Sequence, residues 1–261
     1  MTEPVLVERD ADGIALVTLN RPELRNPVTD RDVVDALETT LLALDADLSN
    51  RVVILTGAGS AFSSGGNLNN MTPGGGLVAA DPVETRRLYK QGVQRLPLLF
   101  EKLELPVIAA VNGAAIGAGC DLACMCDLRI ASERARFAES FVKLGLISGD
   151  GGAWLLPRIV GFSKACEMSL TGDPIDAEEA LRCGLVSKVV APDQLLEEAR
   201  SLACRIAVNP PHAVRMTKRL LRQGQQASMS AVLEAAAAMQ ALAHTTDDFN
   251  AALAGFLARS R

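Results

Sequence analysis

Apolar residues in the first 140 positions recur at two spacings, which predict strands alternating with helices. After Asp30, apolar residues three and four positions apart indicate a helix that buries one face. Short apolar runs bounded by turn residues indicate buried strands, and these runs occupy positions 14–19, 52–56, 107–111, 128–131 and 135–137. The alternation predicts an α/β fold whose parallel strands are joined by right-handed crossovers.

The second half of the chain has a mainly helical pattern. From Gly151 onward helical spacing recurs with few interruptions, and a single strand is predicted at 185–190. Asp176 is the expected N-cap of the helix that starts beside it. The other predicted helices cover positions 153–160, 163–170, 194–208, 211–222, 228–243 and 246–257.

A segment rich in glycine and asparagine separates the second predicted strand from the next helical pattern. Positions 61–76 hold too many of these residues for regular structure, so we expect a mobile loop over a site. Helical spacing resumes at Glu84 and continues to Leu103, and Pro97 is expected to kink or break it. The loop therefore separates two structured parts of the chain.

The stretch from Val107 to Asp121 combines a buried strand, three glycines and the start of a helix. Glycines leave backbone N–H groups uncovered, so a ligand can approach them closely. If the helix begins at Ala118, its first N–H groups have no partner inside the helix, and the helix dipole favours negative charge there. The stretch is therefore a candidate site for an oxyanion.

Composition and charge exclude several classes of function. Apolar residues make up 49% of the chain, which excludes a disordered protein. A net charge of −5 gives no overall attraction to nucleic acid or to an anionic membrane. No apolar run reaches the ~18 residues of a membrane span, and the N-terminal residues do not resemble a signal peptide. We therefore expect a cytoplasmic protein with neither nucleic acid nor membrane as a partner.

Histidine and cysteine are poor candidates for the chemistry. The chain has six cysteines, whose spacing matches no zinc framework, and only two histidines, in C-terminal helices. Small buried thiols are the simpler interpretation of the cysteines. A histidine-assisted nucleophile and a histidine-bound metal are both disfavoured, and we expect no metal site. Any proton chemistry must then fall to carboxylates.

Several motifs in a fixed order resemble the crotonase superfamily, the enoyl-CoA hydratase/isomerase group. Each motif alone is weak evidence, but together they cover nearly the whole chain. The motifs are 20–22, 57–66, 106–121, 136–137, 145–152, 170–172 with 176–177, 184–186, and 245–249 with Phe256.

The resemblance implies a crotonase-like ββα spiral core with a helical C-terminal trimerisation region. Residues 1–195 would form the core with the acyl-CoA site, and residues 196–261 would form the helical region. Self-association as a trimer or a dimer of trimers is implied. The reaction would be hydration of an enoyl-CoA in the degradation of fatty or related acyl groups. Coenzyme A would enter as part of the substrate, with no separate cofactor.

The resemblance also assigns binding residues. It places the thioester carbonyl between the N–H groups of Gly66 and Ala118. These two donors stabilise the enolate more than the ground state, and one such donor is worth ~3 kcal/mol. The residues expected to bind the substrate are Arg25, Asn26, Ser64, Asn67, Leu68, Phe141, Trp154, Phe256 and Arg259.

The acid and base are less clearly assigned. Asp121 matches the first acid of the hydratases, although a carboxylate there also favours the helix dipole. The second acid would fall at Phe141, which departs from the family pattern. Asp150 lies at or next to a position where some relatives carry a working aspartate, and its alternative role is an N-cap. Glu139 ranks third, since it is equally expected to pair with Arg136 or Lys143.

Other functions remain as alternatives. A double-bond isomerase or a hydrolase of the same fold would use the same oxyanion site. A CoA-binding protein without catalysis would explain the lost acid at Phe141. A dinucleotide oxidoreductase is disfavoured, because the spacing of Gly113, Gly117 and Gly119 is not that of a Rossmann fingerprint.

Overall fold

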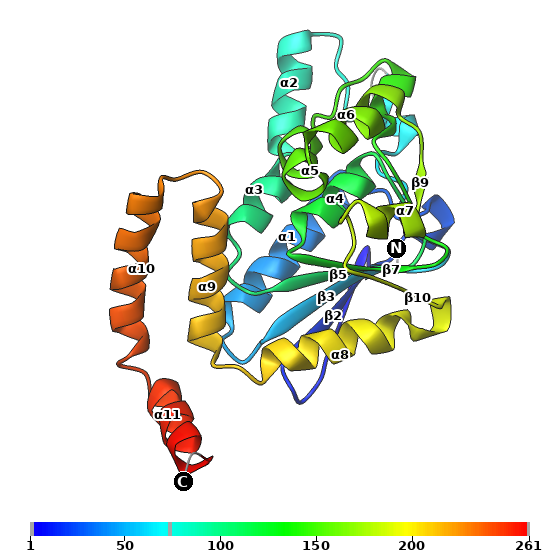
Figure 1. Cartoon of the computed structure of the whole chain (residues 1–261). Helices are drawn as coiled ribbons and strands as arrows, with labels where there is room; N and C mark the ends of the chain where they lie inside the picture. The colour runs from blue at the N-terminus through cyan, green and yellow to red at the C-terminus, as the bar shows by residue number, and fades with distance from the viewer. Residues whose placement is uncertain (1–2, 73–74, 260–261) are drawn as a thin grey trace.

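Two β-sheets form the core of the computed structural model, which describes residues 3–72 and 75–259 (Figure 1). Within those residues the larger sheet has the strand order β1-β2-β3-β5-β7-β10. β1 is antiparallel to β2, and the other neighbours are parallel. The bounds are β1 (Val5–Arg9), β2 (Ile14–Leu19), β3 (Val52–Gly57), β5 (Val107–Val111), β7 (Leu128–Ser132) and β10 (Lys188–Val190).

The smaller sheet holds the short strands that follow those of the larger one. Its order among the described residues is β4-β6-β8-β9, comprising β4 (Ala61–Ser63), β6 (Ala114–Ile116), β8 (Arg136–Ala138) and β9 (Ile175–Asp176). β4, β6 and β8 are parallel, so the chain repeats a long strand, a short strand and a helix. The crotonase-like ββα core expected from the sequence is therefore present.

The helices lie close to the positions predicted from the apolar spacing. One break between two helices falls at a different residue from the one predicted. The pattern between 84 and 103 divides at Gly92, and Pro97 lies in the first turn of the following helix, where proline is tolerated. Asp176 caps its helix by accepting from the Glu179 N–H at 2.8 Å. No helix of the described residues is long and apolar enough to cross a membrane.

The helices are α1 (Arg31–Ala46), α2 (Pro82–Gln91), α3 (Arg95–Lys102), α4 (Ala118–Met125), α5 (Gly152–Val160), α6 (Phe162–Thr171), α7 (Ala177–Arg182), α8 (Leu195–Ala207), α9 (Pro211–Gly224), α10 (Met229–Ala243) and α11 (Asp247–Arg259), with short 3₁₀ turns η1 (Pro22–Leu24), η2 (Leu68–Met71), η3 (Ser140–Leu144) and η4 (Pro192–Gln194).

Both faces of the larger sheet are covered, which explains the continuous apolar runs of its strands. One face packs with α1, α3, α4 and α5 in a single core cluster. The opposite face packs against α8, where Leu195, Ala199 and Ala203 meet β-branched residues of the sheet. Figure 1 shows α8 lying along the sheet, while α10 stands beside α9 and α11 projects away. Helix α8 therefore packs as part of the core, and the helices that extend from the core follow it.

Helix α9 is attached to the core largely by buried cations. Lys218 donates to the Leu105 carbonyl and pairs with Asp127, both at 2.7 Å. Arg222 pairs with the other oxygen of Asp127 at 2.8 Å. Arg215 pairs with Asp45 at 3.0 Å and is only 5% exposed. These contacts fix the angle at which the C-terminal helices leave the core.

Replacing Arg215 with methionine is expected to lower the free energy of unfolding by about 3 kcal/mol. The substitution leaves the mostly buried Asp45 carboxylate without its cation, with only the N–H groups of Glu104 and Leu105 as donors among the described residues. Urea denaturation of wild type and variant measures the change. Arg219→Met on the same helix is the matched control. Its ion pair with Glu104 has side chains 62% and 41% exposed, so its loss should cost less than ~1 kcal/mol. Equal losses for both variants would contradict a buried docking contact at Arg215.

Candidate active site

A cavity of about 410 Å³ lies where β4 and β6 of the smaller sheet meet the start of α4. Both predicted oxyanion donors, Gly66 and Ala118, line it. Four of the predicted substrate-binding residues also line it, namely Ser64, Asn67, Leu68 and Phe141. The structure thus brings together residues that the sequence separates by more than 50 positions.

The two N–H groups come from unrelated segments that press against each other. Ala118 is the first residue of α4, so its N–H has no acceptor inside the helix. The Gly66 N–H donates to no group of the described residues. A side chain at Gly65, where φ is +84°, would come 3.0 Å from the Ala118 nitrogen and 2.2 Å from the Ile116 oxygen. Only glycine permits this approach, which brings both donors to one cavity.

Buried polar contacts hold the segment before Gly66 in place. The Asn26 side chain donates to the carbonyls of Ala58 and Ala61, both at 2.9 Å, and is 1% exposed. The structure therefore places Asn26, predicted to bind substrate, inside the fold. Its neighbour Arg25 is exposed, and the Arg25 carbonyl accepts from the Ser64 N–H at 2.8 Å. The Arg25 side chain lies at the surface beside the cavity residue Leu24.

Helix α1 and the segment 67–70 are joined by amide–carboxylate contacts. Asp30 occupies the N-cap position of α1, but its side chain forms no cap. Its carboxylate instead accepts from the side chains of Asn67 and Asn70 at 3.2 and 2.5 Å. The Asn67 side chain is therefore engaged within the protein. Residues 73–74 of the loop expected to be mobile lie outside the described part of the chain.

Three buried carboxylic acids lie close to one another near the start of α4, and none of them lines this cavity. Asp121, Glu139 and Asp150 are 0%, 1% and 3% exposed. Asp121 is on the first turn of α4, Glu139 follows β8, and Asp150 precedes α5. A side chain at Gly152 would come 2.0 Å from Oδ1 of Asp121, so the start of α5 packs directly on that carboxyl. No backbone N–H and no basic side chain of the described residues donates to either oxygen of Asp121 or Glu139, or to Oδ1 of Asp150.

Burial raises the pKa of all three acids. The pKa of Asp121 is raised well above its ordinary value by burial and then by the charges of Glu139 and Asp150. Burial also raises the pKa of Glu139, and a hydrogen bond from Asp121 opposes that rise. Two ionised carboxylates offer each other no donor, so this contact requires one shared proton. The pKa of Asp150 rises from 3.8 to about 6, chiefly through burial.

These pKa values separate two roles. The raised pKa of Asp121 favours its protonated form, and a proton shared with Glu139 makes this pair the candidate donor. Asp150, with a pKa of about 6, is mostly ionised at neutral pH, so it can accept a proton. Acids whose environments push their pKa values apart are the usual arrangement for acid–base catalysis.

The structure corrects two expectations about the acids. Glu139 pairs with neither Arg136, which donates to the Ala135 carbonyl at 2.8 Å, nor Lys143, which pairs with Asp173 at 2.7 Å. The one sequence signal for the burial of Glu139 is its position directly after a short apolar strand. The capping role for Asp150 is also not adopted, because Gly151 occupies the N-cap position of α5 without a side-chain cap.

Phe141 occupies the position at which the resemblance predicted a second acid. Its ring lies against the start of α4, since a side chain at Gly117 would come 3.6 Å from the ring. Gly117 precedes the donor Ala118, and both line the cavity with Phe141. An apolar ring beside the donors excludes water from them and strengthens their interaction with a developing charge.

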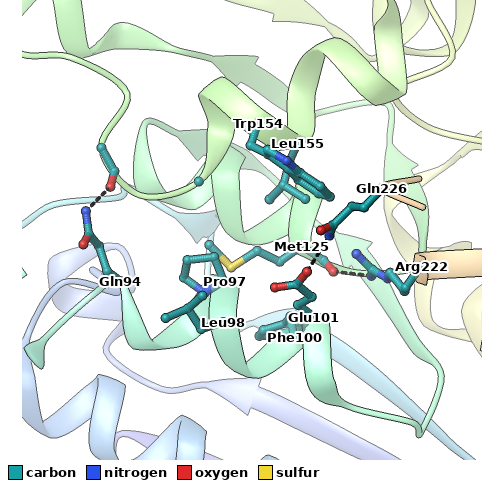
Figure 2. Close-up of a pocket in the computed structure, with 12 residues that line it drawn as sticks. Gln94, Pro97, Leu98, Phe100, Glu101, Met125, Trp154, Leu155, Arg222 and Gln226 are labelled. Carbon is teal, nitrogen blue, oxygen red and sulfur yellow. Dashed lines mark hydrogen bonds between the residues drawn. The ribbon is translucent and has the colours of Figure 1, made fainter. Parts of the chain in front are cut away.

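Trp154 lies in a second cavity, of about 390 Å³, between α3, α4, α5 and α9 (Figure 2). Figure 2 shows it beside Leu155 and facing Met125 and Arg222. Arg158 stacks on its ring at 4.0 Å. Neither oxyanion donor lines this cavity. Trp154, which was expected to bind the substrate, therefore lines a different cavity from the two donors.

The two residues predicted to reach coenzyme A from the last helix are remote from the cavity in this chain. Phe256 is 70% exposed on α11. Figure 1 shows α11 projecting away from the core beyond α9 and α10, well apart from α4. Arg259 ends that helix, and its side chain lies outside the described residues. Phe256 therefore does not reach the cavity of its own chain in this arrangement.

The cysteines behave as packing residues. Cys120, Cys124 and Cys126 are buried free thiols. Burial raises the pKa of Cys126 to about 12, which keeps it a neutral thiol. The described residues include no group of three or more histidine, cysteine, aspartate or glutamate side chains that could hold a metal ion.

Comparison with known proteins identifies the family. The enoyl-CoA hydratase/isomerase family model matches residues 9–261. A short-chain-enoyl-CoA hydratase of Clostridium acetobutylicum is 35% identical over 98% of this chain and 95% of its own length. A solved enoyl-CoA hydratase of Mycobacterium smegmatis has a TM-score of 0.91 and 32% identity, covering 99% of this chain and 97% of that one. A probable enoyl-CoA hydratase/isomerase structure from Mycobacterium abscessus has a TM-score of 0.87, 37% identity, and coverage of 99% and 97%. This chain therefore belongs to the enoyl-CoA hydratase/isomerase family.

Proposed function

We propose that the protein is an enoyl-CoA hydratase, an acyl-CoA enzyme that stabilises a thioester enolate. The observation that supports this most is the first turn of α4. That turn supplies the donor Ala118 and, three residues later, the buried acid Asp121. Gly66, from the segment that packs against this turn, completes the pair of donors that line the cavity. Relatives named short-chain-enoyl-CoA hydratase and crotonyl-CoA hydratase, 35% and 34% identical, support the same reaction.

The proposed mechanism uses each group for one step. The thioester carbonyl accepts hydrogen bonds from the N–H groups of Gly66 and Ala118. Ionised Asp150 takes a proton from water as the oxygen of that water bonds to the β-carbon. The electrons of the double bond move to the carbonyl oxygen, where the two donors stabilise the enolate by ~3 kcal/mol each. Asp121, which shares its proton with Glu139, then protonates the α-carbon to give the 3-hydroxyacyl thioester.

Assembly and coenzyme A contacts form part of the proposal. The C-terminal helices carry exposed apolar residues, including Met229 at 80% and Leu233 at 61% exposure. Burying this surface between copies would drive formation of a trimer or a pair of trimers. In such an assembly Phe256 and Arg259 would serve the site of a neighbouring copy, with Arg25 near the phosphates. We place the enzyme in the cytoplasm and expect no cofactor beyond the coenzyme A of the substrate.

Product analysis in isotopically labelled water tests the reaction. The protein is incubated with a trans-2-enoyl-CoA in water enriched in ¹⁸O, and the products are read by mass spectrometry. Hydration yields a 3-hydroxyacyl-CoA that carries the label on the β-carbon. Recovery of unaltered enoyl-CoA after prolonged incubation would contradict the proposal and favour a CoA-binding protein without catalysis. Release of free coenzyme A would identify a hydrolase.

A double-bond isomerase is the second candidate, and Phe141 is the observation that favours it. An apolar ring at the position expected for the second acid removes one hydrogen-bond partner that could hold an attacking water. Asp150 would then move a proton between two carbons of the acyl chain, with the same enolate stabilised by Gly66 and Ala118. In deuterated water this reaction would place deuterium on carbon and add no hydroxyl group. The same mass spectra therefore separate the two reactions.

A further inference from the structure

A third cavity, of about 460 Å³, lies between α2 and the loop that leads to Asp150. Its volume is within the ~300–1,000 Å³ typical of ligand sites. Leu146 lines both this cavity and the one that holds the thioester donors. Gly149, the residue before Asp150, also lines it. An acyl chain whose carbonyl meets the donors and whose reacting carbons face Asp150 would continue into this third cavity.

One face of α2 forms the polar wall of this cavity. Arg86, Tyr89 and Lys90 line it and share a helix face, since they are three and four positions apart. Arg86 and Lys90 form no ion pair with any described residue. In contrast, the adjacent Arg87 pairs with Glu84 at 3.0 Å and does not line the cavity. Both residues are exposed, so two positive charges without an ion-pair partner border this open cavity.

The rest of the lining does not neutralise these charges. No carboxylate is among the described residues that line the cavity. Burial, and then the charge of Asp150, raise the pKa of Tyr89, so its phenol remains a hydrogen-bond donor. Gln94 donates to the Gly149 carbonyl at 2.8 Å, which ties the end of α2 to the loop beside Asp150 (Figure 2). The cationic wall is thus held next to the acid cluster.

We propose that this cavity binds the distal end of an acyl group that terminates in a carboxylate, with Arg86 and Lys90 as its partners. An apolar chain end would displace water from both cations without forming a hydrogen bond or an ion pair with either of them. A carboxylate would form charge-assisted hydrogen bonds with both, and the neutral Tyr89 phenol can donate a further one. This inference rests on the proposed function, because it names the acyl class that the same site would accept.

Calorimetric binding of two saturated six-carbon thioesters, hexanoyl-CoA and adipoyl-CoA, tests the proposal. They differ only at the distal end, so the ratio of their Kd values cancels the contacts made by coenzyme A. The wild-type protein is expected to bind adipoyl-CoA about tenfold more tightly, the size of one hydrogen bond to a charged group. Arg86→Gln and Lys90→Gln should each reduce this ratio toward one. Arg87→Gln should leave the ratio unchanged.

Two outcomes would overturn the inference. One is equal or weaker binding of adipoyl-CoA by the wild type, including failure of either thioester to bind. The other is an equal loss of affinity for both thioesters in Arg86→Gln and Lys90→Gln, which would place the two cations against the phosphates of coenzyme A. Because neither thioester carries a double bond, the result is independent of turnover. If the protein prefers adipoyl-CoA tenfold but hydrates no enoyl-CoA, this inference holds and the proposed reaction is rejected. If it hydrates enoyl-CoA but shows no such preference, the proposed reaction holds and this inference is rejected.

Discussion

Proline at position 118 is expected to lower kcat for enoyl-CoA turnover by about 10²- to 10³-fold, the usual effect of losing one oxyanion donor. Proline has no amide hydrogen, so the substitution removes the N–H that the enolate needs. Position 118 is the first residue of α4, where proline fits a helix and breaks no intrahelical hydrogen bond. Steady-state assays should show the loss mainly in kcat, because the donor acts on charge that develops in the transition state.

A matched control separates the lost donor from an effect of proline on the backbone. Phe162 is the first residue of α6, is 76% exposed, and also follows a glycine with positive φ. Phe162→Pro should therefore retain wild-type kcat. Both variants are first shown to unfold at a wild-type denaturant midpoint. A folded Ala118→Pro protein with kcat within threefold of wild type would remove Ala118 from the oxyanion hole.

Asparagine at position 150 is expected to lower kcat by about 10²- to 10⁴-fold, the range for a general base, with little change in the Kd of a saturated acyl-CoA. The amide keeps the shape of the carboxylate but cannot accept the proton. In the wild type, kcat should rise as pH passes about 6, because Asp150 must be ionised to act. Unimpaired turnover in both Asp150→Asn and Asp121→Asn would reject the assignment of these acids.

The same variant has an opposite expected effect on stability. The pKa of Asp150 is 3.8 ordinarily and about 6 in the folded protein, so the folded state binds the proton more tightly. The free energy of unfolding of the wild type should therefore fall as the pH rises from about 4 to about 6. The expected loss for this group is roughly 3 kcal/mol. Asp150→Asn carries no charge at any pH, so it should gain stability over the wild type at pH 8. Chemical denaturation at pH 4 and pH 8 measures both effects, and lower stability at pH 8 would contradict a buried, unpaired carboxylate.

Some elements of this fold are determined by local sequence. The runs at 14–19 and 52–56 predict β2 and β3 to within one residue, because strands buried on both faces must be apolar throughout. Helices α6 and α10 follow from apolar spacing and from Ser228, which caps α10. The start of α4 at Ala118 is equally local, since glycines end the preceding strand. The place of one oxyanion donor was therefore predictable from the sequence.

Other elements exist only because of their partners in space. β4 and β6 are three residues long, and the sequence pattern placed them in a loop and a turn. Their pairing with each other and with β8 is what makes them strands. The break between α2 and α3 at Gly92 also differs from the prediction at Pro97. A short strand has too few residues for a periodic signal, so its formation depends on the neighbouring strands.

The sequence by itself determined the α/β class, the family resemblance and the candidate acids Asp121 and Asp150, because those depend on local composition and on motif order. Only the tertiary structure decided that Glu139 faces Asp121 instead of a nearby cation, and that Trp154 lies in a different cavity. Burial and the distance between residues far apart in the sequence set the pKa of each acid, and neither quantity is encoded locally. The chemistry of the site is therefore a property of how β8, α4 and the start of α5 pack together.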